Sequence, residues 1–89
     1  MIKIVRVEPV AGSLLRLEFS DGTAGEYDVR HLVDRDTELT RPLREPGFFA
    51  SVFLELGALA WPNGLELSPS AVHRELEEKG ALRRVRSVA

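Results

Sequence analysis

Residues 59–69 read LAWPNGLELSP, and this stretch organises the second half of the chain. It contains the only tryptophan, Trp61, followed by a Pro-Asn-Gly triplet that accepts the positive φ angles of a bend. We expect short strands on either side of this bend, over 58–61 and 65–67. Ser68 then stands at an N-cap position and Pro69 at the first helical position, where the missing N–H of proline costs nothing. The stretch therefore predicts two short strands that lead into a helix.

The helix is expected over residues 69–79. Val72 and Leu76 are four residues apart and fall on one helical face. Gly80 stands where a helix stop belongs. His73 lies next to Val72 near the start of the helix, and we interpret it as a structural or exposed histidine rather than a catalytic base.

Three further strands are expected in the first 29 residues. Residues 2–8 are rich in β-branched and apolar side chains and end at Pro9. Between residues 15 and 20 apolar and polar side chains alternate, which is typical of a strand with one buried face. The dipeptide Asp21-Gly22 favours a tight hairpin. Residues 23–29 are therefore expected to return antiparallel to the preceding strand.

The middle of the chain predicts less regular structure. We expect a short helical turn at 31–33, a charged surface connection with one brief helical turn over 34–46, and a turn or short helix over 47–52. A strand over 52–56 follows and turns at Gly57. The sum is an α+β domain with a mostly antiparallel sheet of five to six strands, one clear C-terminal helix and short helical turns. We place this single domain at residues 1–80 and a basic C-terminal tail at 81–89.

Length and composition narrow the class of protein. A chain of 89 residues forms one domain with a small core. It has no cysteine, which excludes disulfides and thiolate metal sites and fits a reducing compartment. Charged residues interrupt the apolar N-terminus, unlike a signal peptide, and no apolar run is long enough for a membrane span. We therefore expect a cytoplasmic protein with no membrane contact.

Charge is unevenly distributed along the chain. The formal net charge is −2, yet residues 79–89 carry no acidic side chain. Their basic residues are Lys79, Arg83, Arg84 and Arg86. A basic end of this kind either contacts nucleic acid or is simply a solvated terminus.

Five segments together resemble the signature of a small bacterial family known only as domain of unknown function 2442. In order they are FSDGT at 19–23, DVRHL at 28–32, FFASV at 48–52, WPNG at 61–64 and SP at 68–69. The resemblance covers residues 2–76, and the chain departs from it at Glu66, where the family usually has Asp, and in the segment after Gly80. It implies a compact α+β fold with no established activity. Some relatives are encoded beside another small protein in pairs that look like toxin–antitoxin modules.

Few residues offer catalytic chemistry. Asp28, His31 and Asp34 are spaced by three, with Asp36 close behind, and would converge as metal ligands only in a helical segment. We keep a metal-dependent enzyme built on these residues as a third hypothesis, beside the interpretation of a solvated acidic loop. The serines stand at turns and no Ser-His-Asp or Cys-His arrangement can be proposed. We therefore predict that the chain is not an enzyme and needs no cofactor.

The first hypothesis is a non-catalytic protein-interaction module, with a co-encoded small protein as partner and this chain as the antitoxin-like half of a bacterial two-gene pair. Self-association is the other form of this hypothesis. The second is a nucleic-acid-associated regulator that acts through the basic tail. Trp61 has two interpretations, a core side chain or an anchor at the rim of a groove. The residues predicted to contact a partner are Trp61, Asn63, Phe48, Phe49, Arg83, Arg84 and Arg86.

Overall fold

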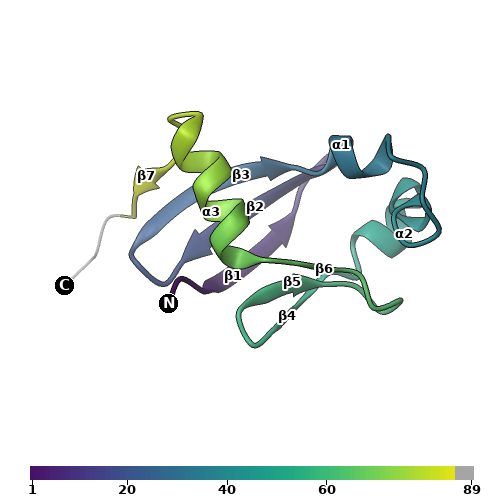
Figure 1. Ribbon diagram of the computed structural model, residues 1–89, viewed down its shortest axis with the longest axis horizontal. Helices are drawn as coiled ribbons and strands as arrows, with labels where there is room; N and C mark the ends of the chain where they lie inside the picture. Colours follow the sequence, from purple (N-terminus) through teal and green to yellow (C-terminus); the bar gives the residue numbers. More distant parts are fainter. Residues whose placement is uncertain (86–89) are drawn as a thin grey trace.

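One antiparallel sheet is built mainly from the N-terminal third of the chain. The computed structural model describes residues 1–85. Strands β1 (Ile4–Pro9), β2 (Leu14–Phe19), β3 (Thr23–Asp28) and β7 (Arg83–Arg84) form a sheet in the order β1-β2-β3-β7 (Figure 1). The Asp21-Gly22 hairpin predicted between β2 and β3 is confirmed, and every neighbouring pair in this sheet is antiparallel.

Alternation along the central strands separates a core face from an open face. Leu15, Leu17 and Phe19 of β2 are buried, whereas Arg16 is exposed. Helix α3 (Pro69–Glu78) lies across the buried face (Figure 1). It covers that face with the side chains of Val72 and Leu76. The open face carries charged side chains, as is common for an antiparallel sheet with one solvated side.

Helix α3 begins and ends where the sequence predicts. The Ser68 hydroxyl accepts a hydrogen bond from the backbone N–H of Ala71 at 3.2 Å, as expected for an N-cap. At the other end Gly80 has a φ of 64°. The N–H of Ala81 donates to the carbonyl of Leu76 at 2.8 Å and that of Gly80 donates to Glu77 at 3.0 Å, the pair of bonds that closes a Schellman motif.

The second half of the chain forms a separate small sheet, so the prediction of a single sheet of five to six strands is wrong in this respect. Strands β4 (Phe53–Glu55), β5 (Ala58–Ala60) and β6 (Glu66–Leu67) pair antiparallel in the order β4-β5-β6. The Ile4 N–H donates to the Gly57 carbonyl at 2.8 Å and ties the two sheets together. β1 is bulged between Ile4 and Arg6, and because a bulge bends its strand and disrupts the ladder, no continuous sheet forms across this junction.

Three short helices connect the sheets at one end of the molecule. They are α1 (Arg30–Val33), the 3-10 helix η1 (Arg41–Arg44) and α2 (Pro46–Phe49), and α1 and α2 lie together at the right in Figure 1. The predicted helical turns in this region are therefore confirmed. None of the helices in residues 1–85 has the length and apolar character needed to cross a membrane.

A single core joins both sheets and α3. Its members are buried residues from every part of the chain, among them Ile4 of β1, Leu59 of β5 and Trp61. The folded unit also extends past residue 80, where the sequence predicts a tail. Arg83 and Arg84 pair with Ala24 and Thr23 at the edge of β3, because that edge offers unpaired backbone groups. Residues 81–85 are thus part of the domain.

Candidate functional site

Trp61 is a core residue. Its side chain is 1% exposed, and its indole N–H donates to the carbonyl of Phe49 at 3.1 Å. The core interpretation of Trp61 is therefore confirmed, and no groove rim exposes the indole. Phe49 is also buried. Neither side chain offers surface on which a partner could dock.

Asn63 and Phe48 have structural contacts in the same region. The Asn63 amide donates to the Leu39 carbonyl at 3.0 Å and accepts from the Leu65 N–H at 3.2 Å, so it holds the bend after Trp61 against the loop that precedes η1. Phe48 is half-buried and packs against the core. Of the four residues predicted here as partner contacts, only Asn63 is exposed, and the structure does not bring them together as one surface.

The basic residues near the C-terminus are exposed on β7. Arg83 and Arg84 line a hollow of about 540 Å³ together with Arg6 of β1, on the open face of the large sheet. Arg84 also donates from Nη1 to the Asp21 carbonyl at 3.2 Å. Arg86, the remaining predicted contact, lies outside the described residues. Arg16, Glu8 and Glu18 also line this hollow, so it combines arginines from both edges of the sheet with two carboxylates.

The acidic and histidine side chains between residues 28 and 36 do not gather into one centre. Asp28 accepts hydrogen bonds from the Ser13 hydroxyl and from the Arg30 N–H, and these bonds lower the pKa of its carboxyl. His31 is turned to the Tyr27 hydroxyl, 3.4 Å away. Within residues 1–85 there is no group of three His, Asp or Glu side chains placed to hold a metal ion.

His73 joins α3 to the β2–β3 hairpin. Its Nε2 lies 2.9 Å from Asp21 Oδ2, and its ring meets Phe19 edge-on at a centroid distance of 4.9 Å. The Asp21 carboxylate also accepts from the Thr23 hydroxyl and N–H, and the hydroxyl bond is the main reason why its pKa is lowered. The arrangement is a contact between elements, in keeping with the structural role expected of His73.

The sequence prediction missed three exposed apolar side chains, one on β1 and two on the β4–β5 hairpin. Their exposed fractions are 89% for Leu56, 58% for Val5 and 43% for Phe53. We call these three residues the Leu56 patch. Large apolar side chains are usually read as core, so the sequence alone gives no reason to place them on the surface.

The backbone at Leu56 is the most unusual feature of this patch. Glu55 pairs with Ala58, and the two residues between them have positive φ angles, 50° at Leu56 and 86° at Gly57. A hairpin loop of this form strongly favours Asn-Gly, because bulky side chains clash with the backbone at positive φ. Leu56 is therefore both strained and exposed. A Leu-Gly pair where Asn-Gly is the norm is the signal that could have drawn attention to it.

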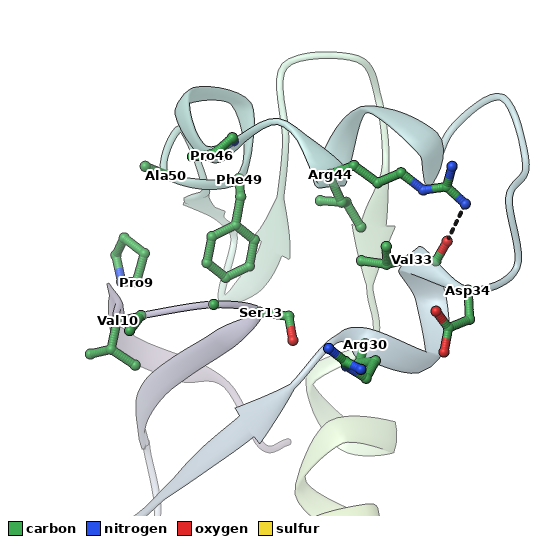
Figure 2. Close-up of a pocket in the computed structure, with 13 residues that line it drawn as sticks. Pro9, Val10, Ser13, Arg30, Val33, Asp34, Arg44, Pro46, Phe49 and Ala50 are labelled. Carbon is green, nitrogen blue, oxygen red and sulfur yellow. Dashed lines mark hydrogen bonds between the residues drawn. The ribbon is translucent and has the colours of Figure 1, made fainter.

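A pocket of about 590 Å³ lies at the opposite side of the fold, among the short helices. Figure 2 shows it between the Val10–Ser13 loop and α1 on one side and η1 and α2 on the other. The ring of Phe49 points into it from α2, and Val33 faces it from α1. Arg30, Asp34 and Arg44 supply the charged part of its lining.

Comparisons with known proteins find one family. A family model described as protein of unknown function (DUF2442) matches residues 4–78, which is most of the chain. No curated protein and no solved structure matches it.

Proposed function

The chain belongs to the family of proteins of unknown function DUF2442, and for this member we propose the role of a non-catalytic protein-interaction module. The observation that carries the proposal is Leu56, a bulky apolar side chain that is 89% exposed at a backbone φ of 50°. Strain of this kind persists where the surroundings over-determine it, and it concentrates at functional positions.

Two costs meet at Leu56 in the isolated protein. A left-handed backbone costs an L-residue about 1–2 kcal/mol relative to its ordinary conformation. The exposed side chain also forgoes the roughly 1.5–3 kcal/mol that full burial of a leucine contributes. A partner that covers Leu56 restores the stabilisation that comes from burying its side chain. Binding therefore gives a physical reason for a residue that folding alone disfavours.

The backbone of the turn that carries Leu56 is tied to β1, which favours recognition. The Gly57 carbonyl accepts the Ile4 N–H, so the turn is fixed to β1. Gly57 also lies so close to the stem of Lys3 that an added Cβ would come within 2.7 Å of the Lys3 Cβ. An anchor that is already ordered loses little conformational entropy on binding. Val5 and Phe53 are exposed on β1 and β4, two elements that contact each other.

Two pairs of titratable side chains support a non-catalytic role, because each pair connects two structural elements. His73 and Asp21 join α3 to a hairpin, and the Tyr27 hydroxyl donates to Glu75 at 2.7 Å between β3 and α3. Each of these groups therefore has a stabilising contact that accounts for its position.

As the partner we propose a small co-encoded protein, with this chain as the antitoxin-like half of a two-gene pair. The support is the resemblance to relatives that are encoded in such pairs. Expression of the neighbouring gene alone should arrest growth, and co-expression of this chain should restore it. Growth arrest that this chain does not relieve would remove the antitoxin-like role while leaving protein binding open.

The interaction is tested by tagged pull-down with matched variants. Wild type should retain one stoichiometric protein through a high-salt wash, and Leu56→Asn should lose it. Leu39→Asn is the control, because Leu39 is also an exposed leucine, at 46%, but lies in a different loop. Equal recovery by wild type and Leu56→Asn would contradict a role for the patch. Sedimentation velocity on the purified chain shows whether the partner is a second copy.

A nucleic-acid-associated regulator is the second candidate, and the excess of arginines over glutamates in the hollow on the open face favours it. Arginines bind phosphates, and displaced counterions make such binding strongly dependent on salt. If this role holds, affinity for duplex DNA should fall steeply between 50 and 200 mM salt, values at which phosphate contacts weaken strongly. Arg83→Gln with Arg84→Gln should flatten that dependence. If the chain does not bind duplex DNA even at low salt, the nucleic-acid-associated role is excluded.

A further inference from the structure

We propose that the pocket among the short helices binds a small organic anion with an apolar body. The pocket is the one shown in Figure 2, with a volume of about 590 Å³. That volume falls in the range of about 300–1,000 Å³ typical of small-molecule sites. The proposal is independent of the Leu56 patch, which lies on other elements.

The apolar part of the pocket is a pre-formed wall. Phe49 and Leu43 are each 4% exposed and belong to the main core. The Phe49 ring points into the pocket from α2, with Val33 opposite (Figure 2). The Phe49 backbone is also fixed, because its carbonyl accepts the Trp61 indole N–H. Because Phe49 and Leu43 expose little area themselves, a flat or aliphatic body would contact mainly the less buried apolar lining residues Val10, Val33 and Pro46.

The charged part of the lining holds two arginines and one aspartate, and an arginine that is left without an ion pair favours an anion. Arg30 lies on α1 and Arg44 on η1, whereas Asp34 is the one acidic residue in the lining. Asp34 lies at the rim, on the far side of Val33 from the Phe49 ring (Figure 2). In this view Val33 stands between the Asp34 carboxylate and the part of the pocket beside Phe49.

Arg30 is the residue that we assign to the anionic group. Arg44 already donates to the Val33 carbonyl at 3.4 Å and pairs with Asp36 at 3.3 Å. Among the ion pairs of residues 1–85, none involves the Arg30 guanidinium, although its charge helps to lower the pKa of the nearby Asp28 carboxyl. Its fork of N–H donors matches a carboxylate, sulfonate or phosphate group in a bidentate geometry. The ligand class is thus an apolar body that carries one such group.

The test uses two probes that differ in charge. 3-Phenylpropionate and 3-phenylpropan-1-ol have the same apolar body, and an NMR titration of the ¹⁵N-labelled full chain measures the affinity of each. The acid should bind at least about tenfold more tightly than the alcohol, as expected for a charge-assisted contact. The amides that shift should be those of the pocket, at Ser13, Val33 and Ala50. Shifts centred on Ala24 and Arg83 instead would place binding in the other hollow and overturn the assignment.

Variants separate the role of Arg30 from general effects on the fold. Arg30→Gln should bring the affinity of the acid down to that of the alcohol and leave the alcohol unchanged. Arg35→Gln is the control, because Arg35 is exposed nearby but does not line the pocket. Ala50→Leu should weaken both probes by filling the pocket. A preference for the acid that survives in Arg30→Gln, or failure of both probes to bind wild type, would overturn the proposal.

Discussion

At the scale of single residues, the two positions of the β4–β5 turn suit their backbone conformations unequally. Leu56 takes a backbone conformation that suits Asn or Gly, whereas Gly57 takes one that suits it well. The neighbouring Lys3 stem leaves no room for a side chain at Gly57. One of the two turn residues therefore suits its backbone conformation, and the other does not, which is why we propose that Leu56 is kept for contact with a partner.

Gly57→Ala is predicted to destabilise the protein for two reasons, its φ of 86° and a contact of 2.7 Å between the added Cβ and Lys3 Cβ. Gly12→Ala is the matched control, because Gly12 also has a positive φ, 72°, but nothing within 4 Å of the added Cβ. We expect Gly12→Ala to cost about 1 kcal/mol and Gly57→Ala roughly 2–3 kcal/mol in urea unfolding. Equal costs would show that the Lys3 contact has no influence.

At the scale of elements, α3 is attached to the large sheet by polar contacts on the two sides of its apolar stripe. His73 reaches the β2–β3 turn through Asp21, and Glu75 accepts the Tyr27 hydroxyl at 2.7 Å. Tyr27 is almost fully buried, and burial together with the nearby Glu75 raises the pKa of its phenol. The apolar stripe of Val72 and Leu76 lies between these contacts. Packing thus brings α3 to the sheet, and the polar pairs set its position.

Tyr27→Phe is predicted to lower the free energy of unfolding by roughly 1–3 kcal/mol, because the partly buried Glu75 carboxylate loses its hydroxyl donor. Urea unfolding followed by far-UV circular dichroism measures the change. The double variant with Glu75→Gln should be less destabilised than the sum of the single variants. A strictly additive result would mean that the two side chains do not stabilise each other.

We predict that the free energy of unfolding decreases at acidic pH because the Asp21 carboxylate becomes protonated. Its pKa is lowered in the folded state, first by the Thr23 hydroxyl bond, against about 3.9 in an unfolded chain. A carboxyl whose pKa is lower in the folded state stabilises the fold at every pH above its pKa in the unfolded chain. That stabilisation is lost as the pH falls through the pKa of the folded state. The urea midpoint should therefore drop below about pH 4, and Asp21→Asn should show a shallower drop. Parallel curves for the two proteins would contradict this assignment.

At the scale of the whole molecule, the parts predicted from sequence are those with local signals. The Asp21-Gly22 hairpin and the helix Pro69–Glu78 follow from turn residues, alternation and capping within a few positions. The division into two sheets depends on which strands meet in space, and alternation within each strand does not encode that. β7 was missed for the same reason, since two arginines have no strand pattern and depend on the free edge of β3.

The candidate site was harder to predict than the fold. Aromatic residues are often interface anchors, but in so small a domain Trp61 and Phe49 are needed for the core. Leucine, by contrast, is normally read as core, yet Leu56 is almost fully exposed. Its position becomes informative only when the turn geometry is known. The pocket likewise combines residues from four segments that sequence spacing does not connect.

The most direct test of the interaction module measures stability and partner capture for wild type and Leu56→Asn side by side. Because Asn adopts positive φ readily, the variant should unfold at a higher urea midpoint, with a gain of about 1 kcal/mol. The same variant should fail to retain the partner protein that wild type retains. A variant that is more stable and still captures the partner at wild-type level would contradict the claim that Leu56 is kept for binding.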